Sequence, residues 1–138
     1  MKSNIRIAET AGFCFGVNRG VNIIYEALES GKQVATLGPI IHNGAVVEGL
    51  RQKGVTVIAK PSEGVGKTVV IRSHGVSRQV IEELEKFNIP YIDATCPFVA
   101  NIHKIVASAE ENSIIIIAGD KSHPEVLGII GHCSREFL

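Results

Sequence analysis

The stretch TVVIRSHGVSRQVIEELEKFNIPYIDATCP, residues 68–97, has the pattern of a strand–helix–strand unit and decides the fold. Its first four residues and Tyr91–Ile92 are apolar or β-branched, which is typical of short strands buried on both faces of a parallel sheet. Between them, residues 78–87 place apolar side chains on one helical face and charges on the other. Ser77 precedes this helix and is expected to cap it. The unit predicts an α/β fold of parallel βα units with right-handed crossovers.

The rest of the chain repeats this alternation in both directions. We expect strands at Ile5–Ala8, Val34–Leu37, Val55–Ile58, Thr68–Ile71, Tyr91–Ile92, Ile114–Ala118 and Glu136–Leu138. Helices are expected at about 17–30, 44–53, 78–87, 98–111 and 125–130. We expect residues 1–96 to form a first α/β domain and residues 97–138 to begin a second one.

Composition excludes several functional classes. The 138 residues are 45% hydrophobic and 20% charged, as in a globular protein with a buried core. The formal net charge is zero and there is no Trp, so nucleic acid is not an expected partner. The longest apolar run, Ile114–Gly119, is too short to span a membrane. The three cysteines, without a signal-peptide pattern, indicate reduced thiols and a cytoplasmic location.

One regularity points to a site. Five of the expected strands are each followed, just before a helix, by a cysteine or a histidine: Cys14, His42, His74, Cys96 and His123. Ligands of open parallel sheets bind outside the carboxyl ends of the strands. Helix N-termini there favour thiolates and phosphate oxygens. The pattern predicts one shared site, a metal or cluster pocket beside an anion pocket.

Neighbouring residues are given structural interpretations. Cys133 follows the last expected helix and is predicted to be structural, His103 is predicted to face solvent, and Thr95 to cap a helix. Glu125, taken alone, is a carboxylate favoured by the dipole of its helix. The sequence contains no Cys-x-x-Cys, His-Glu-x-x-His, P-loop or G-x-G-x-x-G pattern, so zinc and iron–sulfur ligation both stay open and nucleotide cofactors are not indicated. The Cys96–Pro97 step also occurs in some iron–sulfur ligand runs.

Five motifs carry a resemblance to a known family. They are GFCFGVNR (12–19), LGPIIHN (37–43), IRSHGV (71–76), DATCP (93–97) and HPEVLG (123–128). In this order they resemble the signatures of the 4-hydroxy-3-methylbut-2-enyl diphosphate reductases, which act last in the non-mevalonate isoprenoid pathway. The resemblance runs from about residue 5 to residue 131. It implies a trefoil of three α/β domains around an iron–sulfur cluster, with this chain as the first domain and part of the second.

The resemblance also implies roles for single residues. Cys14 and Cys96 would ligate a [4Fe–4S] cluster, and His42, His74 and His123 would bind the diphosphate of an allylic substrate. Glu125 would supply a proton to the departing hydroxyl. The implied reaction is a two-electron reductive dehydroxylation that gives isopentenyl and dimethylallyl diphosphates. Electrons would come from a ferredoxin- or flavodoxin-type donor.

The match to the family is incomplete. The family is roughly twice this length, and its third cluster cysteine and further diphosphate ligands have no counterpart in these residues. We therefore expect this chain to be inactive by itself. Two other hypotheses stay open, a cluster-free module that binds diphosphates through the three histidines and a zinc-dependent hydrolase built from the same residues.

Overall fold

Four short strands form a parallel sheet in the computed structural model, which describes residues 4–138. They are β1 (Val34–Leu37), β2 (Thr56–Ile58), β3 (Thr68–Ile71) and β4 (Tyr91–Asp93), in the order β2-β1-β3-β4. Each lies within about one residue of its predicted position, and all neighbours pair in parallel. The predicted α/β class is confirmed. The expectation that the chain starts without a signal-peptide pattern concerns residues that include 1–3, and these three lie outside the described residues.

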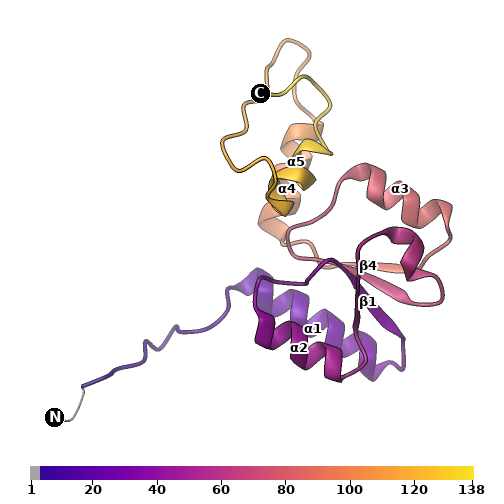
Figure 1. The fold of residues 1–138 in the computed structure, drawn as a ribbon. Helices are drawn as coiled ribbons and strands as arrows, with labels where there is room; N and C mark the ends of the chain where they lie inside the picture. Colours follow the sequence, from indigo (N-terminus) through magenta and orange to yellow (C-terminus); the bar gives the residue numbers. More distant parts are fainter. Residues whose placement is uncertain (1–3) are drawn as a thin grey trace.

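Helices cover both faces of this sheet (Figure 1). Helices α1 (Phe15–Glu29) and α2 (Gly44–Gln52) lie on one face, and α3 (Arg78–Lys86) and the 3₁₀ turn η1 (Pro61–Gly64) on the other. Two hydrophobic clusters result, one under α1 and α2 and one under α3. Because successive strand residues point to opposite faces, Val70 joins the first cluster, and Val69 and Ile71 join the second.

Two further helices lie beyond the carboxyl ends of the strands. They are α4 (Pro97–Ala107) and α5 (Pro124–Ile130), which pack against each other (Figure 1). Proline occupies the first turn of both helices, where its missing N–H costs nothing. The loop between the two helices and the C-terminal segment extend away from the sheet (Figure 1).

Three predicted strands are wrong. Residues 4–8 are extended but unpaired, and Ile5 and Ile7 are 81% and 85% exposed. In place of strands at Ile114–Ala118 and Glu136–Leu138 there is one isolated parallel bridge, between Ile115 and Phe137. An apolar run becomes a strand only where another strand offers its hydrogen bonds. Among residues 4–138, residues 4–8 have no neighbouring strand, and segments 114–118 and 136–138 have no strand beside them other than each other.

Candidate functional site

Three histidines from three separate loops converge. The ring centroids of His42 and His74 are 4.8 Å apart, those of His42 and His123 are 5.9 Å apart, and those of His74 and His123 are 5.7 Å apart. His42 follows β1, His74 follows β3, and His123 is the N-cap residue of α5. We call these three residues the histidine cluster. The structure thus brings together the three imidazoles that the sequence placed at the carboxyl edge of the sheet.

Tight backbone turns place the first two rings. After β1 the chain turns at Gly38, and after His74 it turns at Gly75, both with φ of +72°. Glycine suits these left-handed positions because a Cβ would be strained there. The Gly75 N–H also closes a turn on the Arg72 carbonyl at 2.9 Å. The loop after β1 and the loop after β3 therefore each turn close to the end of their strand. Each turn leaves the histidine of its loop at the edge of the sheet.

Two polar contacts hold the loops in register. The buried Ser73 hydroxyl donates a hydrogen bond to the Ile40 carbonyl at 3.2 Å, which joins the His74 loop to the His42 loop. The Asn43 side chain accepts a hydrogen bond from the Val46 N–H at 3.1 Å and caps α2 immediately after His42. The motif residues around the histidines thus position them through backbone groups.

The electrostatics of the cluster favour an anion. Burial, with the nearby charges of His42, Arg72 and His123, lowers the pKa of His74 from 6.5 to about 4. His74 is therefore neutral near pH 7. Its Nδ1 is buried and has no hydrogen-bond partner among residues 4–138. An unpaired buried polar atom is costly, and a ligand that pairs with it removes that cost.

The sulfur of Cys96 lies beside the first turn of α1, the helix whose N-cap residue is Cys14. Cys14 is the N-cap residue of α1 and Cys96 the N-cap residue of α4. A Cβ built on Gly16, in the first turn of α1, would lie 2.6 Å from the Cys96 Sγ atom. The missing side chain at Gly16 thus makes room for this sulfur. Both cysteines are N-cap residues, next to backbone N–H groups that have no partner within their helix.

Arg19, for which the sequence predicted no role, links the two segments that carry these cysteines. Arg19 of α1 donates hydrogen bonds to the carbonyls of Thr95 at 3.1 Å and Asp93 at 3.4 Å. It therefore fixes α1, which begins after Cys14, against the loop that carries Cys96. The signal was available, because Arg19 closes the motif that contains Cys14.

The cysteine and histidine motifs share a cavity. A space of about 280 Å³ is lined by Phe13, Val17, Ile41, His42, Asn43, Ser73 and His74. Phe13 and Val17 flank the Cys14 end of α1, whereas His42 and His74 belong to the cluster. The cavity thus lies between the segment that begins α1 and two histidines of the cluster. Within residues 4–138, however, no group of three or more His, Cys, Asp or Glu side chains is arranged to hold a metal ion.

Glu125 lies next to the cluster. It is half-buried in the first turn of α5, and its backbone N–H donates a hydrogen bond to Nδ1 of His123 at 3.3 Å. This contact couples the orientation of the His123 ring to the residue predicted to carry the proton. The proton-donor role itself stays a prediction.

Three smaller expectations concern residues near the site. His103 was predicted to face solvent, which is wrong, because it is only 7% exposed. Thr95 does not cap α4, since Cys96 is the N-cap residue and the Thr95 side chain and N–H bind Asp93 instead. Ser77 is the N-cap residue of α3, but its side chain makes no capping hydrogen bond.

Cys133 follows α5, whereas the two predicted ligand cysteines precede α1 and α4. Its half-buried thiol donates a hydrogen bond to the Ile129 carbonyl at 3.5 Å. Burial raises the pKa of this thiol, which disfavours thiolate. These contacts agree with a structural role.

Within the described part of the chain, none of the helices is both long and apolar enough to pass through a membrane.

Fold and site together define an α/β protein with three imidazoles gathered beyond the strands of a parallel sheet and one cysteine, Cys96, directly after its strand β4. Residues 5–138 match the family model described as LytB protein. The chain belongs to the LytB family.

Similar proteins carry a common name. A 4-hydroxy-3-methylbut-2-enyl diphosphate reductase of Caldanaerobacter subterraneus is 47% identical over 135 residues, which is 94% of this chain and 47% of that protein. The protein of the same name from Aquifex aeolicus is 46% identical, over 94% of this chain and 45% of its own length. The chain therefore spans about half the length of the curated relatives it matches.

Solved structures agree with the sequence matches. The structure of an (E)-4-hydroxy-3-methyl-but-2-enyl diphosphate reductase, called the terminal enzyme of the non-mevalonate pathway, aligns with a TM-score of 0.82 and 43% identity. It covers 96% of this chain and 49% of that one. The E-1-hydroxy-2-methyl-but-2-enyl-4-diphosphate reductase of Plasmodium falciparum aligns with a TM-score of 0.86 and 32% identity, over 94% and 42% of the two chains.

Proposed function

We propose that this chain is part of a 4-hydroxy-3-methylbut-2-enyl diphosphate reductase. Its histidine cluster would bind the diphosphate, and two of its cysteine thiolates would bind the iron–sulfur cluster. The observation that carries the proposal is the convergence of His42, His74 and His123, with centroids 4.8–5.9 Å apart. Relatives that share about half of their length with this chain bear that enzyme's name. The motif order at these residues adds further support.

The histidine cluster can bind a diphosphate with few charges of its own. Each imidazole offers an N–H donor, and the oxygens of a diphosphate accept several hydrogen bonds at once. His74, with its low pKa, donates as a neutral ring. Arg72 adds a fixed positive charge that already acts on His74. The resulting site favours a polyanion.

The two thiols fit a thiolate-bound [4Fe–4S] cluster in donor chemistry. Cys14 and Cys96 would hold it at the start of α1, where Gly16 leaves space beside the Cys96 sulfur. Such a cluster, when bound with an open iron, supplies electrons and a Lewis acid for a hydroxyl oxygen. The described residues provide these two thiolates, and further ligation would come from residues beyond them.

The proposed reaction balances with two electrons and two protons. The allylic C–O bond breaks, the hydroxyl leaves as water, and the carbon skeleton gains one hydrogen. Glu125, one position after the first residue of α5 and bonded through its N–H to His123, would deliver a proton toward the leaving hydroxyl. Its carboxyl group acts as an acid only when its pocket keeps it protonated. A ferredoxin- or flavodoxin-type protein in the cytoplasm would supply the electrons.

The test uses the gene product purified anaerobically from its native cells. We expect acid-labile sulfide and an iron–sulfur electron paramagnetic signal that changes when the allylic diphosphate is added. Cys14→Ser and Cys96→Ser should each remove the signal, and Glu125→Gln should keep signal and binding but lose turnover. Cys133→Ser is the matched control and should leave the signal intact.

A second function is favoured by one observation, since the histidine cluster is complete within residues 4–138 while the thiol set is not. A cluster-free diphosphate-binding module would keep its ligand affinity in the Cys14→Ser, Cys96→Ser double variant and would show no labile sulfide in the unaltered protein. That pair of results would contradict the reductase. Stoichiometric zinc without sulfide would instead support the hydrolase.

A further inference from the structure

His103 is a buried histidine that belongs to neither the cluster nor the cysteine pair. It lies on the inner face of α4, one turn after Val99 and three residues before Val106. All three side chains are less than 10% exposed. A ring buried at this position packs against whatever α4 covers.

Two glycines show what the His103 ring covers. A Cβ built on Gly75 would lie 2.5 Å from the ring Cε1, and a Cβ built on Gly128 would lie 3.3 Å from its Nε2. Gly75 directly follows His74, and Gly128 lies in α5, the helix that His123 caps. The ring therefore touches two of the three segments that carry the histidine cluster.

The same two segments also touch each other. A Cβ on Gly128 would lie 3.4 Å from the His74 carbonyl oxygen. The His74 loop and α5 can thus lie close together because Gly75 and Gly128 have no side chains. The His103 ring, which lies against both glycines, also determines this distance. A larger or smaller group at position 103 must change that spacing, because protein interiors are close-packed.

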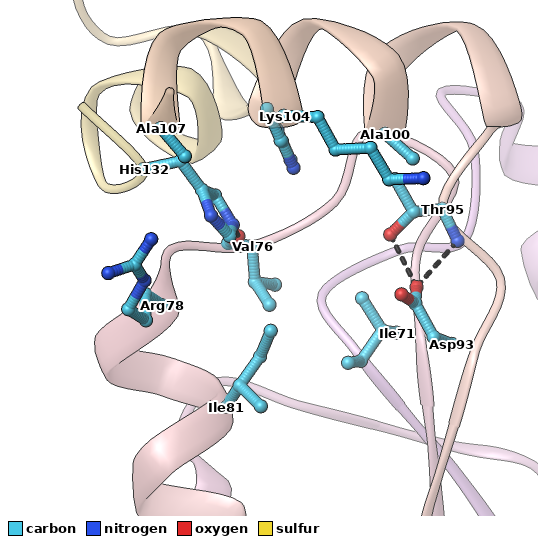
Figure 2. A pocket seen from close by; sticks show the side chains of 11 residues that line it. Ile71, Val76, Arg78, Ile81, Asp93, Thr95, Ala100, Lys104, Ala107 and His132 are labelled. Atoms are coloured by element: carbon cyan, nitrogen blue, oxygen red, sulfur yellow. Dashed lines mark hydrogen bonds between the residues drawn. The ribbon is translucent and has the colours of Figure 1, made fainter. Parts of the chain in front are cut away.

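The other side of the ring is held by His132. The two rings stack with centroids 4.2 Å apart and planes 17° apart. A His132 ring nitrogen lies 3.0 Å from the Val76 carbonyl oxygen. Figure 2 shows His132 between Ala107 of α4 and Val76 of the segment leading to α3. His103 is therefore fixed on both sides.

His103 acts through its shape. Its Nε2 has no hydrogen-bond partner in the described part of the chain. Burial and His132 lower its pKa to about 4, against a smaller opposing effect of Asp93. The ring is therefore neutral near pH 7 and fills its space as a flat wedge.

We propose that His103 is a positioning residue, which sets the spacing of His74 and His123 through Gly75 and Gly128. This proposal rests on the proposed function, in which those two histidines bind the diphosphate. His103 itself contacts no substrate atom. Its effect is transmitted through the two glycine backbones.

The experiment uses the full 138-residue chain and inorganic pyrophosphate as the probe. His103→Ala is expected to weaken binding, measured by calorimetry, about tenfold, the loss expected from one misaligned charge-assisted hydrogen bond. Val106→Ala is the matched control, because it removes a buried side chain from the same face of α4 and is not among the atoms nearest to Gly75 or Gly128. It should change the affinity by less than about twofold.

A spectroscopic measurement separates positioning from loss of stability. In ligand-free His103→Ala, the ring resonances of His74 and His123 should shift more than that of His42, and they should stay in place in Val106→Ala. Equal weakening of binding by the two variants, or unchanged resonances in His103→Ala, would overturn the proposal.

Gly128→Ala provides a second variant that removes nothing from the core. Its methyl group should press on the His103 ring and weaken pyrophosphate binding. In the double variant with His103→Ala, the ring is gone, so the combined loss should be smaller than the product of the two single losses. Independent losses would overturn the proposal.

Failure of the proposed function gives a different result. If the unaltered chain does not bind pyrophosphate, the diphosphate site is contradicted. The ligand-free spectra of His103→Ala and Val106→Ala still decide whether His103 positions His74 and His123.

Discussion

At the scale of single residues, Arg72 and His74 lie in one electrostatic environment. Arg72 contributes to the low pKa of His74, about 4, together with burial and the other cluster histidines. Removing the positive charge in Arg72→Met should raise the pKa of His74, because protonation then meets less repulsion. Nuclear magnetic resonance titration of the His74 ring measures this change. Arg51→Met, which removes an exposed arginine paired with Glu48, should leave the His74 titration unchanged.

Gly16 offers a second prediction at this scale. An Ala at position 16 would place its Cβ 2.6 Å from the Cys96 sulfur, so Gly16→Ala should displace that thiol and lower the iron and sulfide content several-fold. Gly44→Ala is the control, since Gly44 also lies in the first turn of a helix and has no atom within 4 Å of its built Cβ. Gly44→Ala should stabilise the chain by about 0.5–1 kcal/mol. Equal iron content in the two variants would contradict the cysteine geometry.

Sequence patterns alone indicated most of the site residues but left two out. His42 and His74 could be predicted because each follows a buried strand of the same sheet, and parallel strands end at one edge. His123 was predicted from a strand at Ile114–Ala118 that does not form, and it joins the other two as the N-cap residue of α5. His103 was predicted to face solvent because its polar neighbours Asn101 and Lys104 were given too much weight. Its spacing from Val99 and Val106 places it on the buried helix face. The sequence marked Arg19 only as a member of the Cys14 motif, because its partners are backbone carbonyls of a distant segment, which a sequence pattern does not show.

At the scale of elements, the caps of α2 and α3 differ in a measurable way. Asn43 accepts the Val46 N–H, whereas Ser77 makes no side-chain capping bond. Asn43→Ala should therefore lower the free energy of unfolding by about 1 kcal/mol, and Ser77→Ala by only a few tenths. Urea denaturation of both variants measures the difference. A loss in Ser77→Ala as large as that in Asn43→Ala would show that the caps are equivalent.

Four strands were predictable from their aliphatic and β-branched residues, including the partly exposed β2 and β4. β1 and β3 have Val, Ile, Ala or Leu at nearly every position, and three of the four residues of β3 are fully buried. Ile5–Ala8 has a similar composition but, among residues 4–138, no neighbouring strand to complete its hydrogen bonds, and Ile114–Ala118 meets only the short segment 136–138, with which it forms one bridge. The presence of a neighbouring strand depends on the tertiary arrangement. Composition therefore cannot distinguish a paired apolar segment from an unpaired one.

At the scale of the whole molecule, two histidines link folding to pH, the half-buried His74 and the buried His103. His74 and His103 have pKa values of about 4, below their ordinary 6.5. Between pH 6.5 and 4 the unfolded chain therefore binds protons that the folded chain does not. Stability should be fully present above pH 6.5 and fall as the pH drops toward 4. Urea denaturation of the 138-residue chain across this range tests the sign, and His74→Gln should reduce the slope. Constant stability over the range would contradict both low pKa values.

The most direct test of the proposed function is catalysis by the native gene product. The protein would be purified anaerobically, given 4-hydroxy-3-methylbut-2-enyl diphosphate and a low-potential chemical reductant, and its products separated by chromatography. We expect isopentenyl and dimethylallyl diphosphates, with formation reduced by at least about tenfold in His42→Ala and His123→Ala, which each remove one donor to the diphosphate. A preparation that contains iron and labile sulfide, binds pyrophosphate and forms neither product would contradict the account.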